Sequence, residues 1–136
     1  MTVIQKIIAG IAIVFAVLIV SVMGYLIGWP IVGSFIYRTS FESSAWKDSI
    51  KVYEATSWPV RIQMVDDLLS SKKLIGLKRK DVINLLGKPS DDGYFKEHSI
   101  IYWLGPERGF ISIDSEWLVI DIGTDSVVTK ATILRD

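Results

Sequence analysis

An unbroken run of uncharged residues, from 7 to 37, constrains this chain more than any other feature of its sequence. Residues 7–28 are almost entirely apolar, and a helix needs about 20 such residues, at about 1.5 Å each, to cross the hydrocarbon of a bilayer. Because backbone polar groups in lipid must be paired internally, a single isolated span is expected to be helical. Residues 1–37 are therefore predicted to form a transmembrane anchor that contacts lipid through residues 7–29.

The ends of this run refine the prediction. Tyr25 and Trp29 are amphipathic aromatic residues of the kind that favour the headgroup layer, and Pro30 is expected to end or kink the helix. A cleaved signal peptide is the first alternative, but its apolar core spans only about 7–15 residues. A buried soluble helix is the second, but such a helix is rarely apolar on every face in a small domain. Gly24 and Gly28 match a small-xxx-small pattern, which predicts weak homo-association.

The composition changes abruptly at Arg38. From there the chain carries 14 basic and 15 acidic residues, a balance that argues against nucleic-acid binding. The remaining residues suffice for one domain, and the absence of cysteine excludes disulfides and lipidation on cysteine. A very short flank before the anchor favours placement of the domain outside the cytoplasm, although the flanking basic residues are nearly balanced.

The pattern of the soluble part predicts an α+β domain at residues 59–136, preceded by a juxtamembrane connector at residues 38–58. Ser43 or Ser44 is a candidate cap for a short helix within the connector. Helices are expected at residues 60–71 and 79–86, the second stopped by Gly87 and Pro89. Strands are expected at residues 100–104, 116–122 and 126–134, with residues 123–125 as the hairpin turn. Two helices on one face of three antiparallel strands give an ααβββ order. The inward-facing side chains of the middle strand are expected to be Leu118, Ile120 and Ile122. Residues 110–115 fit either an edge strand or a loop.

Several of these positions together resemble a known family. They are Arg61-x-x-Met64-Val65-x-Asp67-Leu68-Leu69, then Leu74-x-Gly76-Leu77, Asp81-Val82-x-x-Leu85-Leu86-Gly87-x-Pro89, Tyr102-x-Leu104-Gly105 and the strand at 118–122. Over residues 60–134 the order resembles the SmpA/OmlA (BamE-like) domain of bacterial envelope lipoproteins. The resemblance implies the ααβββ fold and a non-enzymatic role in binding envelope proteins. The helical anchor is expected to lie in the bacterial inner membrane. The chain departs from the family in lacking a lipidated cysteine and in placing Lys78 where a capping Ser or Thr is usual.

Candidate chemistry is sparse. His98 is the only histidine and has no arranged nucleophile near it in sequence, and the pairs Asp66-Asp67 and Asp91-Asp92 lack the ligand spacing of a calcium loop. Lys78-Arg79-Lys80 is interpreted as a solvated face, with anionic lipid or an acidic partner as the alternative. We therefore predict no catalytic residue, no cofactor and no metal site.

The aromatic residues around the predicted sheet are the best candidates for binding. Tyr102 and Trp103 must point to opposite faces of their strand, and the following loop carries Arg108 and Phe110, residue types that interfaces favour. These four residues are the candidate partner-binding set. They support a membrane-anchored protein-binding or scaffold module, with an inhibitor or immunity-type module as the alternative. A small hydrolase that uses buried carboxylates is a third, less favoured hypothesis.

Overall fold

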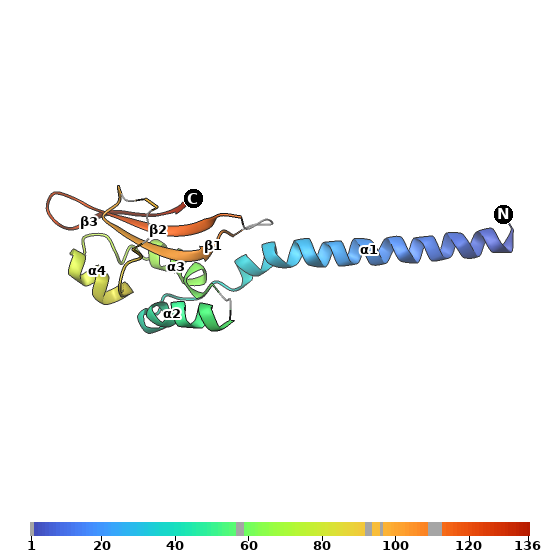
Figure 1. Cartoon of the computed structure of the whole chain (residues 1–136), viewed down its shortest axis with the longest axis horizontal. Helices are drawn as coiled ribbons and strands as arrows, with labels where there is room; N and C mark the ends of the chain where they lie inside the picture. The colour runs from blue at the N-terminus through green and yellow to red at the C-terminus, as the bar shows by residue number, and fades with distance from the viewer. Residues whose placement is uncertain (1, 57–58, 92–93, 96, 109–112) are drawn as a thin grey trace.

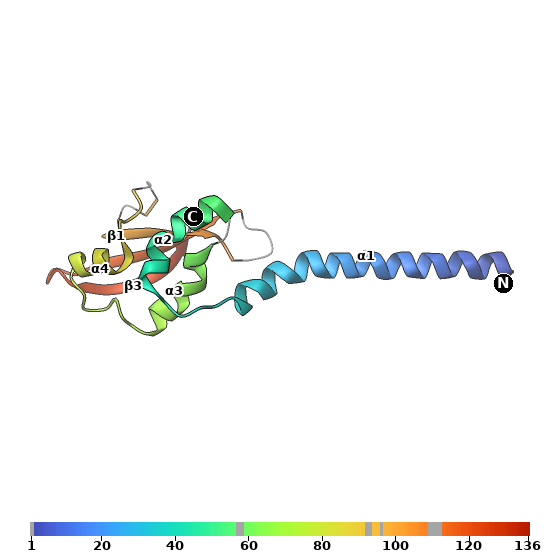
Figure 2. The same cartoon turned by 90° about the horizontal axis from the view of Figure 1, so that it is seen from below.

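A long helix leads into a small domain in which three helices lie against one face of a three-stranded sheet (Figure 1). This computed structural model describes residues 2–56, 59–91, 94, 95, 97–108 and 113–136, and only the backbone of residues 29–36. The N-terminus lies at the end of the long helix that is remote from the domain, as Figure 2 also shows. The predicted α+β fold with an N-terminal apolar helix is therefore confirmed.

The long helix, α1, spans Val3–Ile36, and its 34 residues extend over about 51 Å. Its stretch Val3–Gly28 has a mean hydropathy of 2.9 and is not buried by the rest of the chain. In the described part of the chain, it is the helix that is long and apolar enough to cross a membrane. A single-pass anchor fits this surface, because so large an apolar area is costly in water.

Of the two outcomes expected at Pro30, an end or a kink, the end is excluded, because α1 continues to Ile36. Proline removes one backbone hydrogen bond from a helix interior. Transmembrane helices tolerate that loss, since local adjustments of the helix can satisfy the freed backbone groups. The helical rod therefore reaches almost to Arg38, where the charged part of the chain begins.

The sheet is antiparallel, with the order β1-β2-β3 and with strands at Ile100–Pro106, Ser115–Ile122 and Val128–Arg135. Tyr102 lies opposite Leu118, and Ile120 opposite Ala131. The three predicted strands are confirmed. The last begins two residues late because Ser126, with a φ of 64°, belongs to the hairpin turn.

The main hydrophobic core fills the space between the sheet and the helices. Leu118 and Ile120 are fully buried in it and Ile122 packs at its margin, so the predicted inward set is confirmed. The other buried members are Trp46, Ile62, Met64, Val65, Leu68, Leu74, Val82, Leu86, Ile100, Tyr102, Leu104 and Val128.

Two of the helices match their predicted ranges closely. α3 spans Val60–Ser70 and follows Pro59, while α4 spans Arg79–Leu86. Gly87 ends α4 with a φ of 80°, and its N–H donates to the carbonyl of Ile83. A positive φ costs glycine little, which explains why a glycine stands at this helix end.

The division of the chain at residue 59 needs correction, because α2, at Ser43–Thr56, is an integral part of the domain. Trp46 of α2 is fully buried, and its ring contacts Phe41 and Tyr102 at centroid distances of 5.8 and 6.3 Å. Burial of one tryptophan contributes several kcal/mol to stability. A connector exposed to solvent would not make this contribution. The domain therefore begins before α2 and contains three helices.

The short segment between α1 and α2 is held against α3 by hydrogen bonds that its backbone N–H groups donate. The N–H of Thr39 donates to the carbonyl of Gln63 over 3.0 Å, and that of Phe41 donates to Asp67 Oδ2 over 2.8 Å. Docking therefore begins within a few residues of the end of α1. The segment between the anchor and the domain is therefore much shorter than the expected spacer of about 20 residues.

The outer edge of β1 is closed by side chains from neighbouring segments. Arg61 Nη1 donates to the carbonyl of Trp103 over 3.1 Å, and the Trp103 N–H donates to Ser90 Oγ over 2.9 Å. The N–H of Ser90 donates to the carbonyl of Ile101. An edge with its backbone groups paired is a poor template for strand addition, so this edge is not available for binding in that mode.

Candidate binding surface

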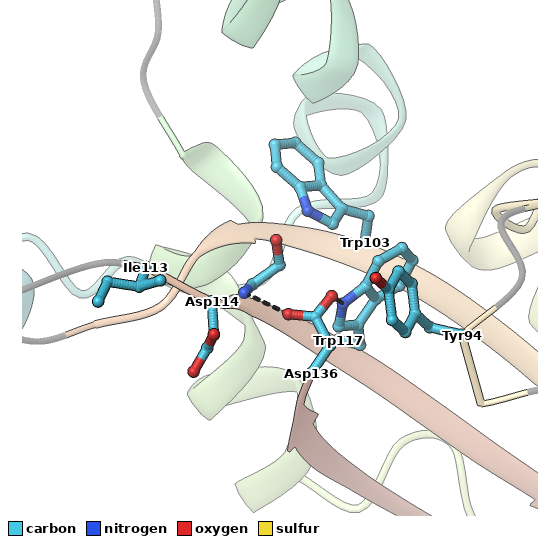
Figure 3. Close-up of a pocket in the computed structure, with 7 residues that line it drawn as sticks. Tyr94, Trp103, Ile113, Asp114, Trp117 and Asp136 are labelled. Carbon is cyan, nitrogen blue, oxygen red and sulfur yellow. Dashed lines mark hydrogen bonds between the residues drawn. The ribbon is translucent and has the colours of Figure 1, made fainter.

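The face of the sheet opposite the helices carries a hollow of about 500 Å³ near the end of β3 (Figure 3). It is lined by Tyr94, Trp103, Ile113, Asp114, Ser115, Trp117 and Asp136. These residues come from β1 and β2, from the residue that follows β3, from the segment before β1 and from the end of the β1–β2 loop. They combine aromatic and charged side chains on one concave surface of the domain.

The floor of this outer hollow is built by alternation along β2. Trp117 and Val119 point away from the main core and, with Ile101, form a second buried cluster. Phe95, before β1, packs on Trp117 with ring centroids 6.4 Å apart, and Tyr94 lies 6.1 Å from the same ring. The chain before β1 therefore folds over the sheet and leaves Tyr94 58% exposed, while Trp117 is only 4% exposed.

Asp136 fixes the polar side of the outer hollow. Its Oδ1 accepts a hydrogen bond of 2.7 Å from the N–H of Ser115, and its Oδ2 accepts one of 3.0 Å from Trp117 Nε1. The two bonds hold the carboxylate beside the indole, as Figure 3 shows. Asp114 and Ile113 lie at the other side of the hollow, and Ile113 is strongly exposed.

One of the four predicted binding residues lies in the hydrophobic core. Tyr102 is fully buried in the main core, its hydroxyl donates to the Gly87 carbonyl over 2.9 Å, and burial raises its pKa to about 12. Its assignment to a binding surface is therefore wrong, because even positions of β1 face the helices. Phe110 lies outside the described residues.

Trp103 is the predicted residue that does line the outer hollow. Its ring stands edge-on to Tyr53 of α2, with centroids 4.9 Å apart, and the side chain is partly buried. The expectation that Tyr102 and Trp103 occupy opposite faces is confirmed. Trp103 thus joins α2 to the outer face of the sheet.

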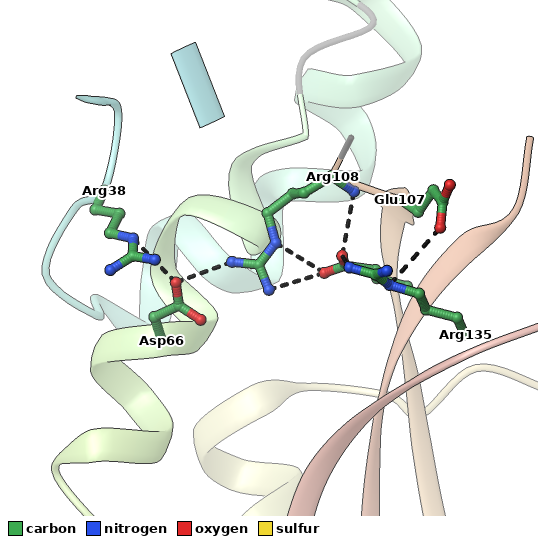
Figure 4. Close-up of polar contacts among 6 residues, drawn as sticks. Arg38, Asp66, Glu107, Arg108 and Arg135 are labelled. Atoms are coloured by element: carbon green, nitrogen blue, oxygen red, sulfur yellow. Dashed lines mark hydrogen bonds and ion pairs between the residues drawn. The ribbon is translucent and has the colours of Figure 1, made fainter. Parts of the chain in front are cut away.

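Arg108 lies in a network of charged residues at the end of the domain from which α1 leaves (Figure 4). Its Nε and Nη2 both lie 2.9 Å from Glu116 Oε2, its N–H donates to Glu116 Oε1, and Nη1 lies 2.9 Å from Asp66 Oδ2. Burial disfavours the cation, but Glu116 and Asp66 outweigh that cost and raise the pKa of Arg108. Arg108 therefore joins two elements within the domain, which explains its partial burial.

The network extends to both ends of the domain sequence. Arg38 Nε lies 3.1 Å from Asp66 Oδ2, and Arg135 Nη2 donates to Glu116 Oε1 over 3.1 Å. Glu116 is fully buried. The network consequently connects the segment after α1 with α3, the β1–β2 loop, β2 and β3.

The other charged candidates make local contacts. His98 Nδ1 lies 2.6 Å from Asp121 Oδ1, and Lys88 Nζ lies 2.7 Å from Asp91 Oδ2. Arg79 donates to the carbonyl of Ser99. Across the described ranges, His, Asp and Glu form no group of three or more that could hold a metal ion.

The candidate set of four residues did not include Tyr94, Asp114 or Asp136. Strand alternation alone places Trp117 outward, and an antiparallel hairpin through residues 123–127 brings the end of β3 opposite Ser115. A prediction of this register would have placed Asp136 beside Ser115. The position of Tyr94 over the Trp117 ring is not indicated by any periodic pattern in the sequence. Comparison of the chain with protein-family models, with curated proteins and with solved structures finds no match.

Proposed function

We propose that this protein is a non-enzymatic, membrane-anchored module that binds another protein in the bacterial cell envelope. α1 supplies the anchor, and the domain supplies one free sheet face with a hollow of about 500 Å³. That outer hollow carries the proposal. The resemblance of residues 60–134 to SmpA/OmlA domains adds the envelope setting and remains a prediction, as does placement of the domain outside the cytoplasm.

The chemistry of the outer hollow favours a protein partner. Aromatic side chains at the centre of a concave surface with polar groups around them are typical of interaction hot spots. Tyr94 and Ile113 are exposed, so they gain burial when a partner covers them. The helices cover the opposite face and side chains close the edge of β1, whereas this face is open to a large ligand.

The polar groups that could serve catalysis have structural contacts instead. In the described part of the chain, His98 contacts the carboxylates of Asp121 and Glu97 rather than a hydroxyl or thiol nucleophile. Glu116, the fully buried carboxylate, accepts hydrogen bonds from two arginines. Glu116 therefore has a structural role between two arginines, which supports a binding role for the domain over hydrolysis.

Site-specific photo-crosslinking in native membranes tests the proposal. A photoreactive residue at Tyr94 or Ile113 of the full chain should give discrete adducts with another protein. The same residue at Ile75, which is similarly exposed between α3 and α4, serves as the matched control and should not. Equal adduct patterns at all three positions would contradict a binding surface at the outer hollow.

Orientation needs its own measurement. A cysteine introduced at the exposed Thr129 would be the only thiol of the chain. A membrane-impermeant maleimide should label it in intact spheroplasts if the domain lies outside the cytoplasm. Labelling only after lysis would place the domain inside and remove the envelope setting from the proposal.

A further inference from the structure

We propose that the outer hollow receives an arginine side chain from the protein partner. This inference rests on the proposed function and specifies the chemistry of the contact. Three aromatic rings and two carboxylates face one concavity, and that combination matches a planar cation on an apolar stem.

The aromatic residues provide the surface for the cation and its stem. Tyr94 and Trp103 supply the partly exposed rings of the outer hollow, and Trp117, which is almost completely buried, lies beneath them as its floor (Figure 3). A guanidinium lies favourably against aromatic faces within about 6 Å of the ring centroid, and tryptophan is the strongest partner. A lysine ammonium is more strongly hydrated and stacks less well, so this surface favours arginine.

The carboxylates provide the charge. Asp114 and Asp136 give the outer hollow two acidic groups, and the described residues that line it include no basic side chain. Asp136 already accepts one hydrogen bond at each oxygen, from Ser115 and from Trp117. A carboxylate has about four acceptor sites, so Asp136 retains capacity for the N–H groups of an arginine while its position stays fixed.

The same charge argues against two other ligands. Two carboxylates repel an anionic lipid headgroup, so the outer hollow is unsuited to an acidic membrane surface. A purely apolar peptide would leave both carboxylates under a low-dielectric cover without a counter-charge, which is costly. A cationic side chain satisfies the rings and the carboxylates together.

Nuclear magnetic resonance of the full chain in detergent micelles tests the inference with defined probes. The probes are short capped peptides that differ only at a central arginine, lysine or glutamine. The arginine peptide should shift the indole N–H resonances of Trp103 and Trp117 saturably, the lysine peptide should bind more weakly, and the glutamine peptide weakest of all. Binding of the glutamine peptide as tight as that of the arginine peptide would overturn the inference, as would the absence of saturable shifts.

Neutral variants test the role of charge. Asp114→Asn should weaken binding of the arginine peptide by about two- to fivefold, because each solvent-accessible ion pair contributes only modestly. Glu54→Gln on α2 removes one exposed charge from a residue that does not line the outer hollow and is the matched control. Equal affinities of the two variants would overturn the charge argument.

The inference and the proposed function fail in different ways. If photoreactive residues at Tyr94 and Ile113 give no crosslinks to another protein, the proposed function itself is contradicted. If these crosslinks persist in Asp114→Asn with unchanged yield at all salt concentrations, then the outer hollow binds a protein but not through an arginine. If they weaken in Asp114→Asn and in high salt, while Glu54→Gln has no effect, both proposals are supported.

Discussion

At the scale of single residues, Glu116 is the fully buried member of the charged network around Arg108. It forms ion pairs with Arg108 and Arg135, and Arg108 also forms an ion pair with Asp66. A buried carboxylate is stabilised only when its charge is compensated and its acceptors are satisfied. Three hydrogen bonds from Arg108 and Arg135 meet both conditions.

Glu116→Gln tests this account because it preserves size and removes the charge. Arg108 would keep Asp66 but lose its principal partner, so the free energy of unfolding should fall by about 2 kcal/mol. For a domain of this size, that loss lowers Tm by about 10 °C. Near-UV circular dichroism of the full chain in micelles would measure it. Glu54→Gln should leave Tm unchanged, and equal values for both variants would contradict the account.

Gly105 is a second residue whose environment makes a sharp prediction. Its φ is +141°, and a Cβ there would lie 2.9 Å from Pro59 Cβ and 3.1 Å from Ile62 Cδ1. Gly76 also has a positive φ, of +82°, but open space around it. Gly105→Ala should therefore cost about 3 kcal/mol, and Gly76→Ala about 1 kcal/mol. Thermal unfolding of both variants compares the two costs, and a smaller loss at Gly105 would show that the α3–β1 contact yields easily.

At the scale of elements, α2 converts a two-helix layer into a three-helix layer. Its Trp46 ring lies between Phe41 and Tyr102, and Arg61 stands over the same ring at 5.3 Å. Arg61 Nε also donates to the carbonyl of Trp46, and burial lowers the pKa of Arg61 to about 10. One side chain of α2 thus organises the contact among α2, α3 and β1.

Truncation of Trp46 should therefore destabilise the whole domain. Trp46→Ala should cost about 3–5 kcal/mol through lost burial and cavity formation. Trp46→Phe should cost clearly less, since it keeps an aromatic ring and removes an indole N–H that has no hydrogen-bond partner in the described structure. Hydrogen exchange would show α2 and α3 opening together. Fast exchange of α2 in the unaltered protein, with α3 protected, would mean that α2 is a separate connector.

The accuracy of the sequence predictions follows from how local each signal is. α4 and its stop at Gly87 depend on neighbouring residues, and the alternation of Leu118 and Ile120 depends on strand geometry, so both were predictable. The packing of α2 against the domain depends on contacts of Trp46 with residues far along the chain. Hydrophobic periodicity within α2 carries no information about these contacts. The outer hollow was half predictable, because Trp103 and Trp117 follow alternation and Tyr94 does not.

At the scale of the whole molecule, the anchor and the domain are joined by a short, well-connected segment. Hydrogen bonds from Thr39 and Phe41 fix it to α3, and the ion pair of Arg38 with Asp66 links it to the charged network (Figure 4). A free linker would let the domain reorient and lower the effective concentration of its binding surface. This docking should instead fix the direction in which the outer hollow faces relative to the membrane.

Electron–electron distance measurements test that orientation, and the absence of cysteine lets labels be added without other changes. Spin labels at the exposed positions Leu26 on α1 and Lys130 on β3 should give one narrow distance distribution in the full chain in nanodiscs. Replacing Asp66 and Asp67 by alanine removes the acceptors for Arg38 and Phe41, so the distribution should broaden. Asp91→Ala breaks only the exposed pair with Lys88 and is the control. A broad distribution in the unaltered protein would mean that the contacts at residues 38–41 are too weak to orient the domain. Partner binding would then have to supply the order that the docked segment is expected to provide.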